Sequence, residues 1–133
     1  MSQRLSAVLV LAGVLVATGP VLAHHSFAGQ FDVNKPTAIK GVVTKVDWIN
    51  PHVYVYVDVT NEQGNVTKWS IETFGPGRMR TEGLTKATFG IGKPVTVQMY
   101  ASRDGSNVGF LRTITFADGH TIEVWLGDPS TER

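Results

Sequence analysis

Cysteine is absent from all 133 residues of the chain. The protein therefore has no disulfide, no thiolate metal site and no lipid-modified cysteine after an export signal. A hydrophobic core alone must stabilise the fold, and 42% hydrophobic with 17% charged residues is the composition of a packed globular domain. A metal site in this chain therefore has no thiolate donor.

An excess of either charge is also missing. The chain has 12 Lys and Arg against 11 Asp and Glu, and the basic residues are scattered singly among acidic ones. Proteins that bind phosphate backbones need clustered Lys and Arg, which release counterions from the nucleic acid. The sequence therefore predicts no nucleic-acid partner.

The common catalytic signatures are absent too. The sequence has no cysteine nucleophile, no Gly-x-Ser-x-Gly turn and no glycine-rich phosphate loop. Glu72 could act as a base or join a histidine as a metal ligand, but a carboxylate at the end of a strand is more typical of a solvated face. These features favour a binding protein over an enzyme, and an enzyme that uses Glu72 and a metal stays open as a third class.

One apolar run stands out, and it lies at the N-terminus. Arg4 precedes residues 5–18, which are almost wholly apolar but shorter than the roughly 20 residues that a membrane span requires. A Gly-Pro pair then breaks any helix, and small side chains lead to a cleavage site after Ala23. We predict a signal peptide at residues 1–23, a periplasmic mature protein that begins at His24, and no membrane span once the leader is removed. An uncleaved N-terminal anchor is the alternative.

The mature chain, residues 24–133, is predicted to fold as one all-β domain. Residues 53–59 alternate cleanly, with four valines on one face and Tyr54, Tyr56 and Asp58 on the other, as in a strand with one buried face. Strands are expected at residues 37–49, 53–59, 66–72, 95–100, 108–116 and 121–125, with short helical turns near 78–82 and 85–89.

This order of elements matches a small OB-like Greek-key barrel of five to six strands with a short helical link after the third strand. The first strand of such a barrel is long and bent, and Gly41 is placed where the bend can occur. An immunoglobulin-like sandwich is the alternative, although it needs about seven strands and usually lacks the helical link. Pairing of the first strand with both the second and the fourth would distinguish the barrel from the sandwich.

Three of the four histidines lie near the start of the mature chain, and they suggest a metal site. Cleavage before His24 would give that residue a free amine, which could chelate one ion together with the ring nitrogen. His52, in the Asn50-Pro51-His52 turn, is the expected third donor, and His25 is a further one. Nitrogen donors in a square-planar array suit Cu(II), so a copper site is predicted at His24, His25 and His52. Alternatively, the first two are exposed terminal residues and His52 only caps a turn.

A metal-free function of the same barrel would depend on its aromatic residues. Trp48, Tyr54, Tyr56 and Trp69 could form a stacking face for a small ligand or for a protein partner in the cell envelope. Alternatively, these four residues belong to the core or pair across neighbouring strands. His120, in a tight hairpin turn, is assigned no role. The sequence thus predicts a non-enzymatic periplasmic binding protein with copper as its ligand, and the metal-free module is the alternative.

Several short motifs are spread over most of the mature chain. They are His24-His25-Ser26-Phe27, Phe31-Asp32 followed by Lys35-Pro36, residues 41–48, Asn50-Pro51-His52, Trp69, Glu72, residues 92–97 and residues 104–107. Together they resemble a family of short exported bacterial proteins of unknown function, and residues 75–83 match it least. The resemblance implies a periplasmic OB-like barrel with an H-H-S-F start and an N-P-H turn, and it implies no activity.

Overall fold

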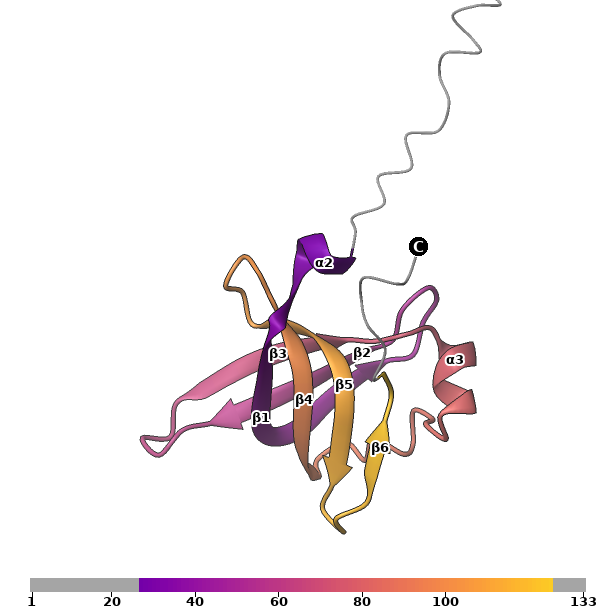
Figure 1. Ribbon diagram of the computed structural model, residues 1–133. Helices are drawn as coiled ribbons and strands as arrows, with labels where there is room; N and C mark the ends of the chain where they lie inside the picture. Colours follow the sequence, from indigo (N-terminus) through magenta and orange to yellow (C-terminus); the bar gives the residue numbers. More distant parts are fainter. Residues whose placement is uncertain (1–26, 126–133) are drawn as a thin grey trace, which may run out of the picture.

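The computed structural model describes residues 27–125, which form six strands and two short helices (Figure 1). The elements are α2 (Phe27–Gln30), β1 (Phe31–Asp47), β2 (Tyr54–Thr60), β3 (Val66–Glu72), α3 (Pro76–Thr81), β4 (Pro94–Ser102), β5 (Val108–Phe116) and β6 (Thr121–Glu123). The six strands form one sheet in the order β3-β2-β1-β4-β5-β6, and an additional parallel pairing joins β3 to β5. This pairing closes the sheet into a barrel.

The first strand pairs with two partners, as the barrel requires. Its first part pairs with β4 up to Val42, and its second part pairs with β2 from Val42 onward. Gly41 lies at this change of partner, where a Cβ atom would come within 2.4 Å of the backbone oxygen of Asp58. The predicted bend at Gly41 is confirmed, and the pairing of β1 with both β2 and β4 establishes the OB-like barrel over the sandwich.

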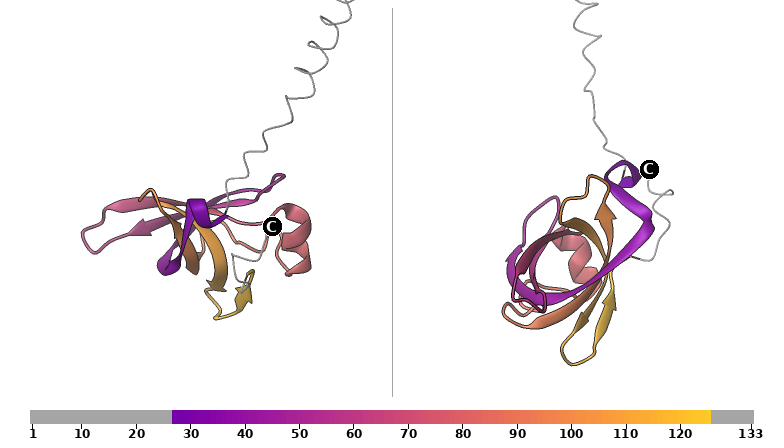
Figure 2. Two further views of the ribbon diagram at one scale, coloured as in Figure 1. Left: turned by 45° about the horizontal axis from the view of Figure 1, so that its top comes forward. Right: turned by 90° about the vertical axis from the view of Figure 1, so that its left-hand side faces the viewer.

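A cluster of aliphatic residues, which we call the main core, fills the barrel. The valines of β2 point inward and its tyrosines outward, as predicted, because successive side chains of a strand alternate between faces. In the right-hand view of Figure 2 the strands form a ring, and α3 lies across its opening. The buried members of the main core are Val43, Val46, Val53, Val55, Val57, Ile71, Met79, Leu84, Phe89, Val95, Val97, Met99, Leu111, Ile114 and Val124.

A second cluster is aromatic. Phe31, Tyr100, Phe110 and Trp125 are buried together, and the partly buried Phe27 and Phe74 pack against them. The rings meet mostly edge to face, which is the preferred arrangement of aromatic pairs. Phe74 also packs against the main core, so this aromatic cluster and the main core are continuous.

Several expected strand boundaries differ from the structure, and two of these differences have a clear cause. The first strand begins at Phe31 rather than at residue 37, because Phe31 already pairs with Ser102 and is buried in the aromatic cluster. The last strand ends at Glu123 rather than at residue 125, since the next two backbone N–H groups both donate to the carbonyl of Arg112.

The second predicted helical turn, near residues 85–89, is wrong. The segment forms hydrogen-bonded turns instead of a helix. Thr85 and Thr88 explain this, because each backbone N–H donates to the hydroxyl of the other residue. Such local bonds compete with the helical pattern. The first predicted turn, near residues 78–82, does correspond to a helix, α3.

Within residues 27–125, none of the helices has the length and apolar character needed to cross a bilayer.

Candidate functional site

The predicted donor His52 lies in the loop between β1 and β2, and backbone hydrogen bonds fix its place. The N–H of Val53 donates to the carbonyl of Phe74 at 3.1 Å, and the N–H of Thr73 donates to the carbonyl of Val53 at 2.9 Å. Gly75 permits a close approach on the same side, since a Cβ there would come within 2.6 Å of the Pro51 carbonyl oxygen. The loop therefore packs on the segment that follows β3.

The side chain of His52 contacts Glu72, the last residue of β3. Nδ1 of the ring forms a hydrogen bond with Oε1 of the carboxylate. The His52 side chain is 44% exposed, whereas that of Glu72 is 11% exposed. The expectation that Glu72 faces solvent was wrong, because β3 pairs with both β2 and β5 at this residue and is covered there.

This pair has a direct chemical consequence. An ionised carboxylate only accepts hydrogen bonds, so the proton of a neutral His52 ring must reside on Nδ1. The lone pair is then on Nε2, the nitrogen that is free to bind an electrophile. A carboxylate that orients a histidine in this way is a regular partner of metal-ligating histidines. Glu72 thus orients the His52 ring through this hydrogen bond, and its Oε1 contacts the ring rather than serving as a second metal ligand.

The other predicted ligands, His24 and His25, lie outside the described residues. Within residues 27–125 no three acidic or histidine side chains gather into a metal-binding group. Phe27, the first residue that the structure describes, is connected to the loop of His52 through aromatic contacts. Its ring lies 4.9 Å from that of Phe110, which lies 5.3 Å from that of Phe74, whose carbonyl binds the residue after His52.

The fourth histidine, His120, is separate from His52. It lies at the turn between β5 and β6, where its ring stacks on Phe116 with 6.4 Å between centroids. Its carbonyl accepts the N–H of Phe116 at 2.8 Å, and its own N–H donates to Asp118. These contacts account for the residue as part of the hairpin turn.

The four aromatic residues of the predicted stacking face do not share one face. Tyr54 and Tyr56 point outward from β2. Trp69 is directly opposite the inward-facing Val57 and packs against the main core, as Trp48 does. The prediction of a single aromatic face was therefore wrong, because the two tryptophans and the two tyrosines lie on opposite sides of the sheet.

The outer face of β2 carries a small charged network instead. Tyr56 donates its hydroxyl hydrogen to Asp47 at 3.1 Å, and the ammonium of Lys45 lies 2.8 Å from the same carboxylate and 5.0 Å from the Tyr56 ring centroid. Hydrogen bonding to Lys45 keeps the pKa of Asp47 below its ordinary value. Burial, followed by the bond to Asp47, raises the pKa of Tyr56.

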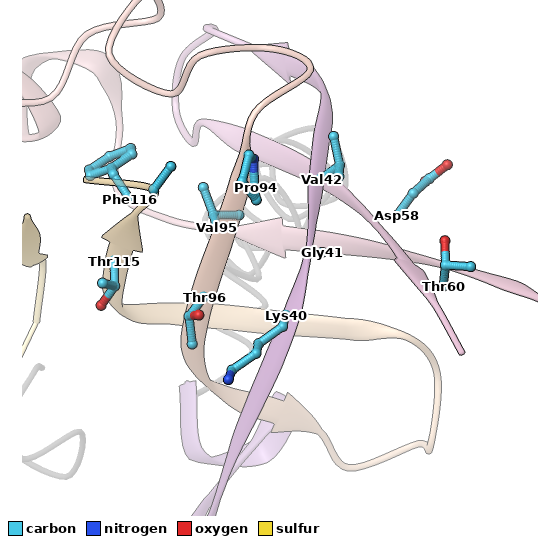
Figure 3. A pocket seen from close by; sticks show the side chains of 11 residues that line it. Lys40, Gly41, Val42, Asp58, Thr60, Pro94, Val95, Thr96, Thr115 and Phe116 are labelled. Atoms are coloured by element: carbon cyan, nitrogen blue, oxygen red, sulfur yellow. The ribbon is translucent and has the colours of Figure 1, made fainter. Parts of the chain in front are cut away.

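An open hollow of about 370 Å³ lies on the outer side of the bend in β1. Figure 3 shows Lys40, Thr96 and Thr115 on one side of β1 and Asp58 and Thr60 on the other. The lining mixes single polar groups from four strands and does not bring two titratable side chains together on one side. Its lining contains none of the predicted metal ligands and none of the four residues of the predicted stacking face.

The residues that sequence reasoning missed are those of the aromatic cluster. Phe27 and Phe31 are spaced by four in a segment to which the sequence prediction assigned no strand or helix. That spacing was the available signal, because residues four apart lie on the same side of a helical turn. The remaining aromatic partners come from distant parts of the chain, so their association could not be read from local pattern.

Some solved structures are similar to this one. The mitochondrial single-stranded DNA binding protein Rim1 from S. cerevisiae aligns with a TM-score of 0.47 and 15% identity, over 62% of this chain and 93% of the other. The N-terminal domain of the PriB protein from Thermoanaerobacter tencongensis aligns with a TM-score of 0.46 and 16% identity, over 63% and 97%. At this identity the similarity implies no shared ligand.

No curated protein matches the sequence significantly. A protein-family model does match it, over residues 11–112, and it is described as a family of unknown function (DUF6152). This match covers most of the chain and includes β1 to β4 and the first five residues of β5. The chain therefore belongs to this family of unknown function, DUF6152.

Proposed function

We propose that the mature protein is a periplasmic, non-enzymatic binding protein that holds copper as Cu(II). The ligands are the amine and ring of His24, the ring of His52 and, as a further donor, His25. The observation that supports this most is the hydrogen bond between His52 and the largely buried Glu72. It leaves Nε2 of a half-exposed ring as a fixed electron-pair donor, which is the usual arrangement of a metal-ligating histidine and its carboxylate partner.

The position of Phe27 supports the participation of the N-terminus. His24 precedes Phe27 by three residues, and three residues of extended chain span at most about 10 Å. Phe27 is anchored in the aromatic cluster, and Phe74 of the same cluster binds the backbone beside His52. This connection between Phe27 and the loop of His52 supports a site that includes the N-terminal residue.

The chemistry of the donors fits Cu(II). A free N-terminal histidine forms a chelate through its amine and imidazole, and His52 adds a third nitrogen. The amine must lose its proton to bind, and terminal amines titrate near pH ~7.7–8.0. Copper binding should therefore weaken as the pH falls below neutrality.

The distribution of charge supports a ligand other than nucleic acid. Several basic side chains are paired with acidic ones, which lowers the local positive potential that a phosphate backbone would require. The pairs are Lys45 with Asp47 at 2.8 Å, Arg78 with Glu82 at 2.8 Å and Arg103 with Asp32 at 3.8 Å.

The test is a Cu(II) titration against a competing chelator, with protein exported and processed in the periplasm. Mass spectrometry should first identify His24 as its N-terminal residue. A variant with three alanines inserted before His24 moves the amine away from the ring and leaves no histidine among its first three residues, so it should bind at least about 100-fold more weakly because a chelate is lost. Equal affinity of the two proteins would disprove the site.

Two matched substitutions test the His52 side of the site. Glu72→Gln should weaken Cu(II) binding about 10- to 100-fold, because the ring loses its orienting carboxylate. His120→Ala removes a histidine from a separate turn and should leave the affinity unchanged. A loss of affinity in His120→Ala that matched the loss in Glu72→Gln would indicate nonspecific histidine binding instead.

A further inference from the structure

A second hollow, of about 370 Å³, lies between the first half of β1, β3 and the loop that joins β4 to β5. Thr37 and Trp69 line it from the inner sides of their strands. Thr37 lies two residues before the core-packed Ile39 and so on the same face of β1, and Trp69 is opposite the buried Val57. Its volume falls in the range of small-molecule sites, and barrel mouths are common places for them.

Trp69 provides the apolar surface of this hollow. It is partly buried and packs against the main core, so the indole is supported by fixed neighbours. The face of an aromatic ring carries partial negative charge and attracts C–H groups of positive character. A flat ligand with a C–H face, such as a sugar ring, is suited to such a surface.

The rim of the hollow is polar and carries both charges. Asp32, Lys35, Arg103 and Asn107 line it, and the guanidinium of Arg103 lies 3.8 Å from the Asp32 carboxylate. The rim therefore offers both donors and acceptors, and its one acidic and two basic side chains leave only a small net charge. This pattern matches a neutral ligand with many hydroxyl groups better than a phosphate or a carboxylate.

Hydrogen bonds hold the rim in place. The backbone N–H of Arg103 donates to Gln30 at 2.9 Å, and its Nε donates to the Ala28 carbonyl at 2.7 Å. On the other side of the loop, the N–H of Ser70 donates to the carbonyl of Asn107 at 3.0 Å. Both ends of the loop are thus attached to other elements, which reduces the entropy that a ligand would have to remove.

We propose that this hollow binds a neutral oligosaccharide. One sugar ring stacks on Trp69, and the hydroxyl groups of the sugar form hydrogen bonds with Asp32, Arg103 and Asn107. The site is distinct from His52 and Glu72 and does not depend on the proposed copper site.

The proposal is tested by nuclear magnetic resonance titration of the protein with maltotriose, cellotriose and triacetylchitotriose. At least one of them should shift the indole N–H signal of Trp69 and the side-chain amide of Asn107, with a Kd of roughly 1 mM, equivalent to about −4 kcal/mol. Trp69→Ala should weaken binding about tenfold or more, and Trp69→Phe should weaken it less because a ring remains.

The controls separate this site from others. Trp48→Phe changes a tryptophan elsewhere on the main core and should bind the sugar normally, as should Glu72→Gln. Circular dichroism of each variant establishes that it is folded. The proposal is overturned if all three sugars leave the Trp69 signal unmoved, if folded Trp69→Ala binds them as tightly as the unaltered protein, or if a thymidine oligonucleotide shifts that signal while the sugars do not.

Discussion

The main core and the aromatic cluster meet at Phe74, yet the chain assembles them in different ways. Most of the main core comes from alternating residues of single strands, such as Val53, Val55 and Val57. The aromatic cluster takes one or two residues each from α2, β1, β4, β5 and the segments that follow β3 and β6. The comparison teaches that alternation identifies the first cluster, whereas the second exists only once the barrel has closed.

The largest expected losses of stability come from removing one phenylalanine ring from each cluster. Comparing them tests whether the two clusters are equally well packed. Phe89 is fully buried in the main core, and Phe110 is 5% exposed in the aromatic cluster. Phe89→Ala and Phe110→Ala should each lower the free energy of unfolding by about 3–5 kcal/mol, because each leaves a cavity. Urea denaturation measures both. A loss below about 1 kcal/mol for Phe110→Ala alone would make the aromatic cluster a loose surface contact.

A second substitution affects the main core through the bend in β1. Gly41→Ala places a methyl group against the backbone of Asp58. Because the backbone cannot move aside as a flexible side chain can, we expect a loss of about 1–3 kcal/mol in the free energy of unfolding. Gly77→Ala is the control, since a Cβ at that position in α3 meets nothing within 4 Å. Equal stability of the two variants would show that the bend tolerates a side chain.

The third substitution loosens the aromatic cluster at its N-terminal member. Phe27 contacts the rings of Phe31, Tyr100, Phe110 and Trp125 but is only partly buried. Phe27→Ala should lower the free energy of unfolding by about 2 kcal/mol, less than Phe110→Ala, because less of the ring leaves water.

The same variant connects the cluster to the proposed copper site. Without the ring, α2 loses its contacts with the aromatic cluster, and Cu(II) affinity should fall severalfold in folded protein. Val108→Ala is the matched control, because Val108 packs against the same cluster from β5. If both variants bound copper as the unaltered protein does, the anchor would have no part in metal binding.

The smallest effect concerns a contact that belongs to neither cluster. The pKa of Asp47 lies below its ordinary value of 3.8, because its carboxylate is bound to Lys45 and then to Tyr56. This contribution to stability is present above pH 3.8 and is lost as the pH falls through the lower value of the folded state. Asp47→Asn should therefore lower the melting temperature slightly at pH 7, and this difference should shrink under acid conditions. A difference that grew with acid would contradict the assignment.

The sequence predicted the barrel because strand alternation and turn residues are local signals. The third and fifth strands were predicted with their observed bounds, and Gly41 with its bend. Phe31 was not assigned to a strand, since its partner Ser102 is distant and its cluster includes residues of five other segments. Tertiary closure, and not local preference, determines that end of β1.

The candidate site was only partly predictable for the same reason. His52 was identified from its turn, but the burial of Glu72 and its contact with His52 depend on β3 having neighbours on both sides. The sequence prediction grouped the two tryptophans and the two tyrosines because all four are aromatic. In the structure the tryptophans pack against the main core, whereas the tyrosines point outward from β2. Trp69 was predicted as part of a shared aromatic face, but it lines a separate hollow beside the β4–β5 loop, which no local pattern indicates.

The double pairing of β1 also constrains the order in which the chain can fold. The part of β1 before Val42 pairs with β4 alone. The backbone of Ala38, for example, has no strand partner until Gln98 is in place. A chain that emerges from its N-terminus first therefore exposes this half-strand, without backbone partners, while β2 and β3 form their hairpin. Contacts so far apart in sequence form slowly. The early half of β1 is thus the segment of the nascent chain most open to mispairing or to capture by a chaperone.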